Sequence, residues 1–133
     1  MLEKLSKQVK RKARIKKIAE RRAYPRIEQR LPFKVSANGY DFSTTTKNLS
    51  CIGAYCKIDK YIPPFTKVKV KLALPLKKAN QMNKLCEIIC EGVIVRTEDD
   101  PERGFNIAIF FNAISDEQRK KISLYINQFL PSS

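Results

Sequence analysis

Residues 67–74 have the sequence Lys-Val-Lys-Val-Lys-Leu-Ala-Leu, in which an apolar side chain occupies every second position. Successive side chains of an extended strand point to opposite faces, so the valines and leucines would share one face. The lysines at the alternate positions would share the other face. The pattern therefore predicts a β-strand with one buried face and one face in water.

Five further strands are predicted around this stretch. Residues 31–37 and 40–46 alternate in the same way, and Asn38-Gly39 between them is a preferred sequence for a tight type I′ hairpin turn. Gly92 would place a bend or a bulge in a long later strand. We expect the remaining strands at about 54–58, 85–97 and 104–111, with polar, solvated loops at 75–83 and 98–103.

One helix is predicted after the last strand. Ser115 and Gln118 form a capping box, in which the serine hydroxyl caps the first turn and the glutamine reaches back. The turns that follow carry a single apolar stripe, Ile122, Tyr125, Ile126 and Phe129, which we interpret as a core-packing face. Six short strands and one helix in 133 residues predict one mainly β domain, a small six-stranded antiparallel barrel closed or flanked by the C-terminal helix.

The positive charge of the chain is concentrated at its N-terminus. The net charge is +14, and residues 1–30, with twelve basic and three acidic residues, carry +9 of it. Residues 2–20 indicate a helical or disordered basic arm, because their apolar positions split between two faces. Pro25 ends any helix near Tyr24. Such an arm attracts phosphates, whether on a nucleotide, a nucleic acid or an anionic membrane, or it serves as a solubilising tail.

The amino-acid composition also limits where the protein can reside and which chemical functions it can have. No stretch approaches the roughly 18 apolar residues that a membrane span needs, and the charged N-terminus lacks the apolar core of a secretory signal. We therefore expect a cytoplasmic protein. The chain has no histidine, which removes the commonest general base and any histidine-based metal site. We therefore expect that the protein is not an enzyme and binds no cofactor.

The four cysteines allow two interpretations. A zinc site is one, since Cys51, Cys56, Cys86 and Cys90 could supply four thiolates. If Cys51 and Cys56 lie on strands, however, their odd separation directs them to opposite faces. A role as small buried apolar side chains is favoured.

Two short motifs carry the chemistry that suggests a ligand. The first is an R-x-x-x-R formed by Arg22 and Arg26, with Arg21 directly before it. An arginine fork matches the paired acceptors O6 and N7 of guanine, and its plane can stack on a purine. In a basic chain the motif alone also fits solvated surface charge, and Arg26 with Arg30 forms a second copy.

The second motif is Asn48-Leu-Ser-Cys-Ile-Gly53, an N-x-S-x-x-G. The Asn48 amide offers a donor and an acceptor, and Ser50 offers a hydroxyl. Gly53 would permit a positive φ in a tight turn, or close approach of a ligand to the backbone. Ordinary turn chemistry explains each of these residues equally well when it is taken alone.

The order and spacing of the two motifs resemble the PilZ domain family, whose members bind the bacterial second messenger cyclic di-GMP. The resemblance covers roughly residues 20–130, including the run from Arg22 into Leu31-Pro-Phe-Lys-Val and the final strand Gly104-Phe-Asn-Ile-Ala-Ile-Phe. It implies a PilZ-like domain at 21–133, in which a flexible arginine segment leads into a six-stranded barrel, after the basic N-terminal arm at 1–20.

The resemblance also implies roles for individual residues. Arg22 and Arg26 would grip guanine edges and phosphates, while Asn48 and Ser50 would contact a guanine from the barrel surface beside Gly53. Asparagine cannot offer the charged acceptor that aspartate offers at this position, which would lower the affinity.

Other arginines extend this expectation. In the PilZ family an arginine at the position of Arg21 tends to accompany two stacked ligand molecules, so the resemblance implies two molecules rather than one. Arg96 or Arg103 could reach the ligand from the later strands.

The leading hypothesis is a non-catalytic receptor or adaptor that changes the conformation of its arm on binding cyclic di-GMP and then acts on an unidentified downstream protein. One alternative is a nucleic-acid-binding module that uses the basic arm, although the arm lacks interleaved aromatic residues for stacking. Another is a PilZ-like interaction platform that binds no ligand.

Overall fold

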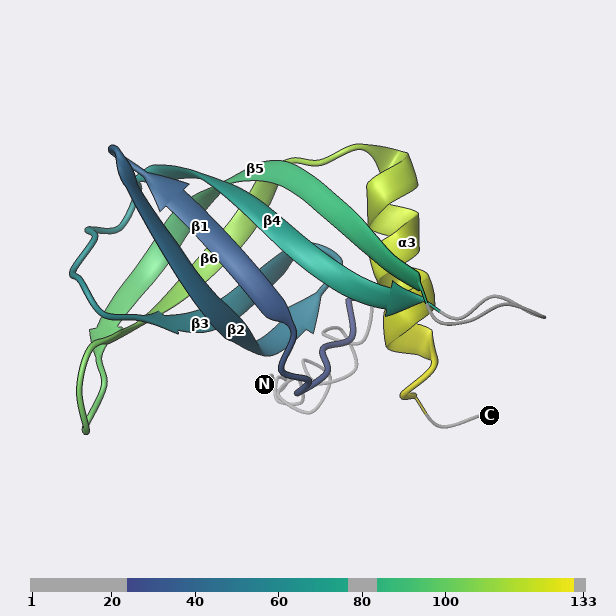
Figure 1. Cartoon of the computed structure of the whole chain (residues 1–133), viewed down its shortest axis with the longest axis horizontal. Coiled ribbons are helices and arrows are strands. Elements are labelled where there is room, and N and C mark those ends of the chain that lie inside the picture. The colour runs from purple at the N-terminus through teal and green to yellow at the C-terminus, as the bar shows by residue number, and fades with distance from the viewer. Residues whose placement is uncertain (1–23, 77–83, 131–133) are drawn as a thin grey trace, which may run out of the picture.

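The computed structural model describes residues 24–76 and 84–130. The predicted helix over residues 2–20, together with Arg21 and Arg22, lies outside the described residues. Within the described part, six strands are followed by one helix (Figure 1). Their bounds are β1 Pro32–Ala37, β2 Tyr40–Ser50, β3 Gly53–Ile58, β4 Lys67–Leu76, β5 Lys84–Asp99, β6 Phe105–Ala113 and α3 Asp116–Asn127.

The strands close into an antiparallel barrel in the order β1-β2-β3-β6-β5-β4. The prediction of a six-stranded barrel with a C-terminal helix is therefore confirmed. Asn38 and Gly39 both have positive φ, 49° and 84°, as the predicted hairpin turn between β1 and β2 requires. The pairing of β5 with β6 shifts between Glu91 and Val93, so Gly92 marks the predicted bulge.

Alternating side chains of every strand fill the inside of the barrel. Val68, Val70, Leu72 and Leu74 of the 67–74 stretch on β4 are buried, while the lysines between them are exposed. Burial of a leucine-sized side chain contributes about 1.5–3 kcal/mol. The core is therefore the main source of stability, and the outer face is left free to carry function.

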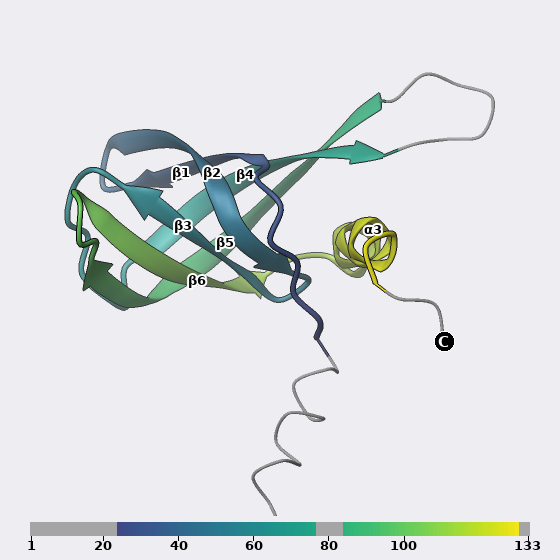
Figure 2. The same cartoon turned by 90° about the horizontal axis from the view of Figure 1, so that it is seen from below.

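Helix α3 lies at one end of the barrel (Figure 1), and β4 and β5 extend beyond the barrel beside it (Figure 2). Its buried residues are Ile122, Tyr125 and Ile126, and the Ser115 hydroxyl accepts a hydrogen bond from the backbone N–H of Gln118. Phe129 was predicted to belong to the same stripe. It follows the last helical residue and is 44% exposed, so this part of the prediction is wrong.

Several strand ends also differ from expectation. Strand β2, expected to end at Thr46, continues to Ser50. Strand β4 continues to Leu76, past Pro75, and β5 continues to Asp99. Asp100, expected in a solvated loop, has a side chain only 10% exposed. None of the helices in the described ranges is long and apolar enough to cross a membrane.

Candidate functional site

The segment before β1 is tied to the end of β2 by a backbone bridge between Ile27 and Leu49. Each residue donates its N–H to the carbonyl of the other, and both N–O distances are 2.9 Å. Both side chains are buried, which anchors the bridge in the core. The bridge brings Arg26 beside the Asn48–Ser50 stretch, although more than twenty residues separate them in sequence.

A second anchor holds the same segment at Thr46, which is completely buried. Its hydroxyl donates to the carbonyl of Gln29 at 2.6 Å and accepts from the backbone N–H of Leu31 at 3.0 Å. The backbone N–H of Thr46 also donates to the Leu31 carbonyl at 3.0 Å. Two fixed points, at residues 27 and 29–31, therefore define where Arg26 leaves the barrel.

We expect Thr46→Val to lower the free energy of unfolding by about 1–2 kcal/mol, because the isosteric valine leaves two backbone groups without their partner. Urea denaturation measures the loss. Thr45→Val is the matched control, since the Thr45 side chain is exposed on the same strand. Equal stabilities for wild type and Thr46→Val would show that the hydroxyl does not hold the segment.

Arg26, Asn48, Ser50 and Gly53 line one surface pocket of about 340 Å³ on the outer face of the barrel. The other lining residues come from the same turn and from β3, β5 and β6, namely Ile52, Ala54, Tyr55, Val95, Arg96, Ala108, Ile109 and Phe110. The volume lies within the range of small-molecule sites, about 300–1,000 Å³. The structure thus brings together every predicted site residue that it describes.

The pocket follows one row of outward positions across four strands. Asn48 on β2 pairs with Tyr55 on β3, Tyr55 pairs with Ala108 on β6, and Ala108 pairs with Arg96 on β5. The small Ala108 therefore lies between an aromatic ring and a guanidinium. Arg96 was one of two later arginines considered from sequence, and the other, Arg103, lines a different pocket.

Asn48 and Ser50 differ in how they are used within the fold. The Ser50 hydroxyl accepts from the backbone N–H of Ile52 at 3.2 Å and is 3.5 Å from the carbonyl of Gly53, so it stabilises the β2–β3 turn. Within residues 24–76 and 84–130, the side-chain amide of Asn48 makes no hydrogen bond, and it is half-buried at the pocket wall. The donor and acceptor of the Asn48 amide are therefore left unused within the described part of the fold.

Of the two roles expected for Gly53, a positive φ in the turn is ruled out. Its φ is not positive, so the turn does not require glycine for that reason. A Cβ atom at this position would collide with the carbonyl oxygen of Ile109 on β6. Glycine is needed here because the backbone of β6 approaches closely.

Tyr55 is an aromatic pocket residue that neither sequence motif revealed. The Arg96 guanidinium lies 5.7 Å from its ring centre and the Lys47 ammonium 6.0 Å from it. Its hydroxyl donates to Glu98 at 3.3 Å, and burial, followed by the Glu98 carboxylate, raises the pKa of Tyr55. Glu98 also forms an ion pair with Arg96 at 3.1 Å. The ring is thus fixed on the outer face and can serve as an aromatic platform.

A polar cluster around Asp100 braces the barrel next to this row. The ammonium groups of Lys47 and Lys57 each lie 3.5 Å from its carboxylate. The backbone N–H of Glu102 and the amide of Asn106 both donate to the carboxylate at 2.9 Å. These hydrogen bonds, with the Glu102 N–H foremost, hold the pKa of Asp100 well below its usual range.

This shift predicts a dependence of stability on pH. A depressed carboxyl pKa contributes stability that is fully present above the ordinary value of about 4 and is lost as the pH falls toward the folded value. We expect Asp100→Asn to be less stable than wild type at pH 7, and the difference to shrink below about pH 4. Urea denaturation between pH 7 and pH 3 measures it, with the exposed Asp59→Asn as control. A difference that stays constant with pH would contradict the assignment.

The four cysteines are free thiols. Cys51 lies in the β2–β3 turn rather than on a strand, so the argument that it points away from Cys56 does not apply. Burial raises the pKa of Cys56 to about 12 and that of Cys90 to about 11. Across the described ranges, no group of histidine, cysteine or acidic side chains is arranged to hold a metal ion.

Comparison with known proteins agrees with this architecture. A protein-family model, PilZ domain, matches residues 20–128. Among solved structures, the Bacillus subtilis inhibitor of motility MotI/DgrA is similar, with a TM-score of 0.68 and 16% identity over 79% of this chain and 49% of that chain. The chain therefore spans about half the length of that protein. No curated protein sequence matches significantly.

The structural likeness, at that level of identity, shows a shared fold. The family match covers most of the chain, including the arginine segment, the barrel and α3. The chain belongs to the PilZ domain family.

Proposed function

We propose that this protein is a receptor for cyclic di-GMP and has no catalytic activity of its own. The observation that carries the proposal is that Arg26, Asn48, Ser50 and Gly53 line a single pocket. They come from two sequence motifs that a backbone bridge joins. PilZ domains are generally receptor domains without catalytic activity, which supports the same conclusion.

The chemistry of the pocket suits a dinucleotide with two guanines and two phosphates. Arg26, and Arg22 from the segment before it, supply forks for a guanine edge or a phosphate. The unpartnered amide of Asn48 hydrogen-bonds a guanine edge. Arg96 adds a second described positive charge, and the fixed ring of Tyr55 offers a face for stacking.

Arg21 sets the number of ligand molecules in this proposal. A third guanidinium directly before Arg22 supports two stacked molecules rather than one. The stoichiometry of binding tests this point separately from the affinity.

The receptor acts as an adaptor. Arg21 and Arg22 must reach the pocket that Arg26 lines, so the ligand fixes the basic arm at 1–20 relative to the barrel. The cost of fixing the arm is taken from the binding free energy. An unidentified downstream protein recognises the changed position of the arm.

The proposal is tested by isothermal titration of cyclic di-GMP into wild type and Asn48→Ala. We expect Asn48→Ala to weaken binding about tenfold, since one or two hydrogen bonds to the ligand are lost. Asn112→Ala is the matched control, because Asn112 is exposed on β6 and does not line the pocket. Absence of binding to wild type, or equal affinities for wild type and Asn48→Ala, would refute the proposed site.

A further inference from the structure

One side of β2 is open along half of its length. Strand β2 pairs with β1 from Tyr40 to Thr45, but its pairing with β3 starts only at Thr46. The last residues of β3 pair only with β6, where Lys57 lies opposite Asn106. Among the described residues, no strand pairs with the other edge of residues 40–45. We call the space between this edge and the end of β3 the β2–β3 seam.

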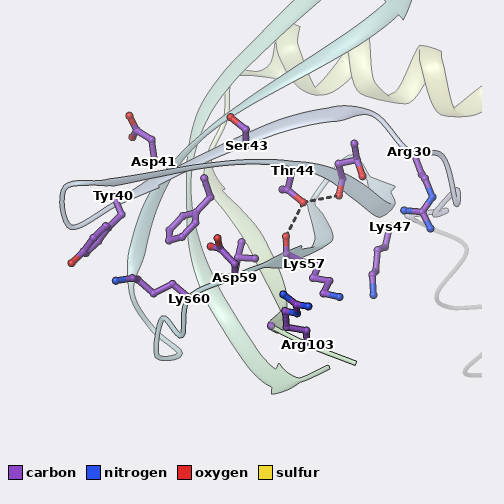
Figure 3. Close-up of a pocket in the computed structure, with 14 residues that line it drawn as sticks. Arg30, Tyr40, Asp41, Ser43, Thr44, Lys47, Lys57, Asp59, Lys60 and Arg103 are labelled. Atoms are coloured by element: carbon purple, nitrogen blue, oxygen red, sulfur yellow. Dashed lines mark hydrogen bonds between the residues drawn. The ribbon is translucent and has the colours of Figure 1, made fainter. Parts of the chain in front are cut away.

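The seam is a pocket with a volume of about 620 Å³ (Figure 3). All six residues from Tyr40 to Thr45 line it along one wall. The opposite wall consists of residues 57–60, which are the end of β3 and the two residues after it, and of the loop residues Arg103 and Gly104. Arg30 and Lys47 lie at one end. Its walls are therefore a free strand edge on one side and a charged surface on the other.

Side chains, rather than a backbone ladder, span the seam. The Thr44 hydroxyl donates to the carbonyl of Lys57 at 2.7 Å. Near the other end, the Lys60 ammonium lies 4.4 Å from the ring centre of Tyr40. Along β2, the backbone N–H and C=O groups of successive residues point alternately toward β1 and away from it. Tyr40 pairs with Ala37 across the hairpin turn, so its backbone groups point toward β1. The backbone groups of Asp41, Ser43 and Thr45 therefore point into the seam.

Positive charge dominates the lining of the seam. Five lysines and arginines line it, against the carboxylates of Asp41 and Asp59. Lys47 and Lys57 are already paired with Asp100. The basic residues are Arg30, Lys47, Lys57, Lys60 and Arg103. Arg30, Lys60 and Arg103 form no ion pair with another described residue, so they are available to pair with acidic groups of another molecule.

The free edge also lacks most of the devices that protect such edges. Natural edge strands carry lysines, prolines or inward charges, or are covered, because unpaired backbone groups recruit another strand. Residues 40–45, Tyr-Asp-Phe-Ser-Thr-Thr, contain neither lysine nor proline. Threonine and aromatic residues favour extended structure.

We propose that the β2–β3 seam binds an extended, acidic segment of a partner protein, which adds a short strand to the free edge of β2. Backbone hydrogen bonds to β2 supply the register, and carboxylates of the segment pair with Lys60, Arg103 and Arg30. A second copy of this chain is disfavoured as the occupant, since each copy carries a net charge of +14. The seam shares none of its lining residues with the Asn48 pocket, so this proposal does not depend on the dinucleotide.

The test is a two-dimensional amide NMR titration of the full chain with the capped peptide Glu-Val-Glu-Thr-Glu-Val. We expect resonance shifts and slowed hydrogen exchange at residues 40–45 and shifts at 57–60. The double variant Lys60→Glu/Arg103→Glu should weaken binding about tenfold, as two surface ion pairs are lost. The matched control Lys69→Glu/Lys71→Glu changes the net charge equally on exposed positions of β4, and should stay within about twofold of wild type.

Two peptide controls separate strand addition from charge attraction. The same peptide methylated at alternate backbone nitrogens keeps its charge but loses donors, and it should bind at least about tenfold more weakly. Sodium triphosphate should not shift residues 40–45 as the peptide does. The proposal is overturned if millimolar peptide shifts nothing in the seam, if the methylated peptide binds equally, if both double variants lose equal affinity, or if triphosphate reproduces the shifts. Retained peptide binding by Asn48→Ala would confirm that the two sites are separate.

Discussion

Gly53→Val is expected to lower the free energy of unfolding by about 3 kcal/mol, near the upper end of the cost of overpacking. The first atom of any side chain at this position meets the backbone carbonyl of Ile109, which cannot rotate away as a side chain can. Gly53 pairs with Phe110 on β6 and, on its other side, with Ser50 on β2. Strand β3 must therefore shift against both neighbours to admit the valine.

Urea denaturation of Gly53→Val measures this loss, and Thr45→Val introduces the same side chain at an exposed strand position as a control. We expect the control to stay within about 0.5 kcal/mol of wild type. Wild-type stability for Gly53→Val would show that β3 and β6 are not in close contact at this point. A loss of ligand binding without a loss of stability would assign Gly53 to ligand contact alone.

Arg26→Ala is expected to weaken cyclic di-GMP binding by about 100-fold, since a bidentate arginine–guanine contact contributes about 1–3 kcal/mol. Arg26 is exposed, lines the pocket and is held there by the bridge at Ile27. Arg26→Lys keeps the charge but cannot form two parallel hydrogen bonds, so it should recover only part of the affinity. Arg22→Ala is expected to act in the same direction.

Arg30→Ala is the informative control for this prediction. Arg30 forms an R-x-x-x-R with Arg26 that is formally equivalent to the one with Arg22, but it lines the β2–β3 seam instead of the Asn48 pocket. It should therefore keep the wild-type affinity for the dinucleotide within about threefold, as expected for one distant surface charge. Equal losses for Arg26→Ala and Arg30→Ala would indicate attraction by net positive charge rather than a built site.

Much of the fold was predictable because it depends on local patterns. The alternation on β4, the Asn38-Gly39 turn and the Ser115 cap each report a geometry that spans only a few residues. Phe129 was misassigned because helical periodicity does not show that the helix has already ended. Asp100 was misassigned because its burial depends on Lys47 and Lys57, which lie on strands distant in sequence.

The candidate site divides in the same way. Asn48, Ser50 and Gly53 are close together in sequence, so a motif can reveal them. Tyr55 and Arg96 become neighbours only through the registers of β3, β6 and β5, which no short pattern encodes. The reason for glycine at 53 depends likewise on where β6 lies. The open edge of β2 requires knowing where its pairing with β3 begins.

The central claim is that one ligand is held jointly by the arginine segment and the end of β2. Hydrogen–deuterium exchange of the full chain with and without saturating cyclic di-GMP tests it most directly. The account predicts slowed exchange at residues 21–27 and 48–55, with residues 40–45 unchanged. Unchanged exchange at both of these segments, or protection confined to the β2–β3 seam, would contradict it.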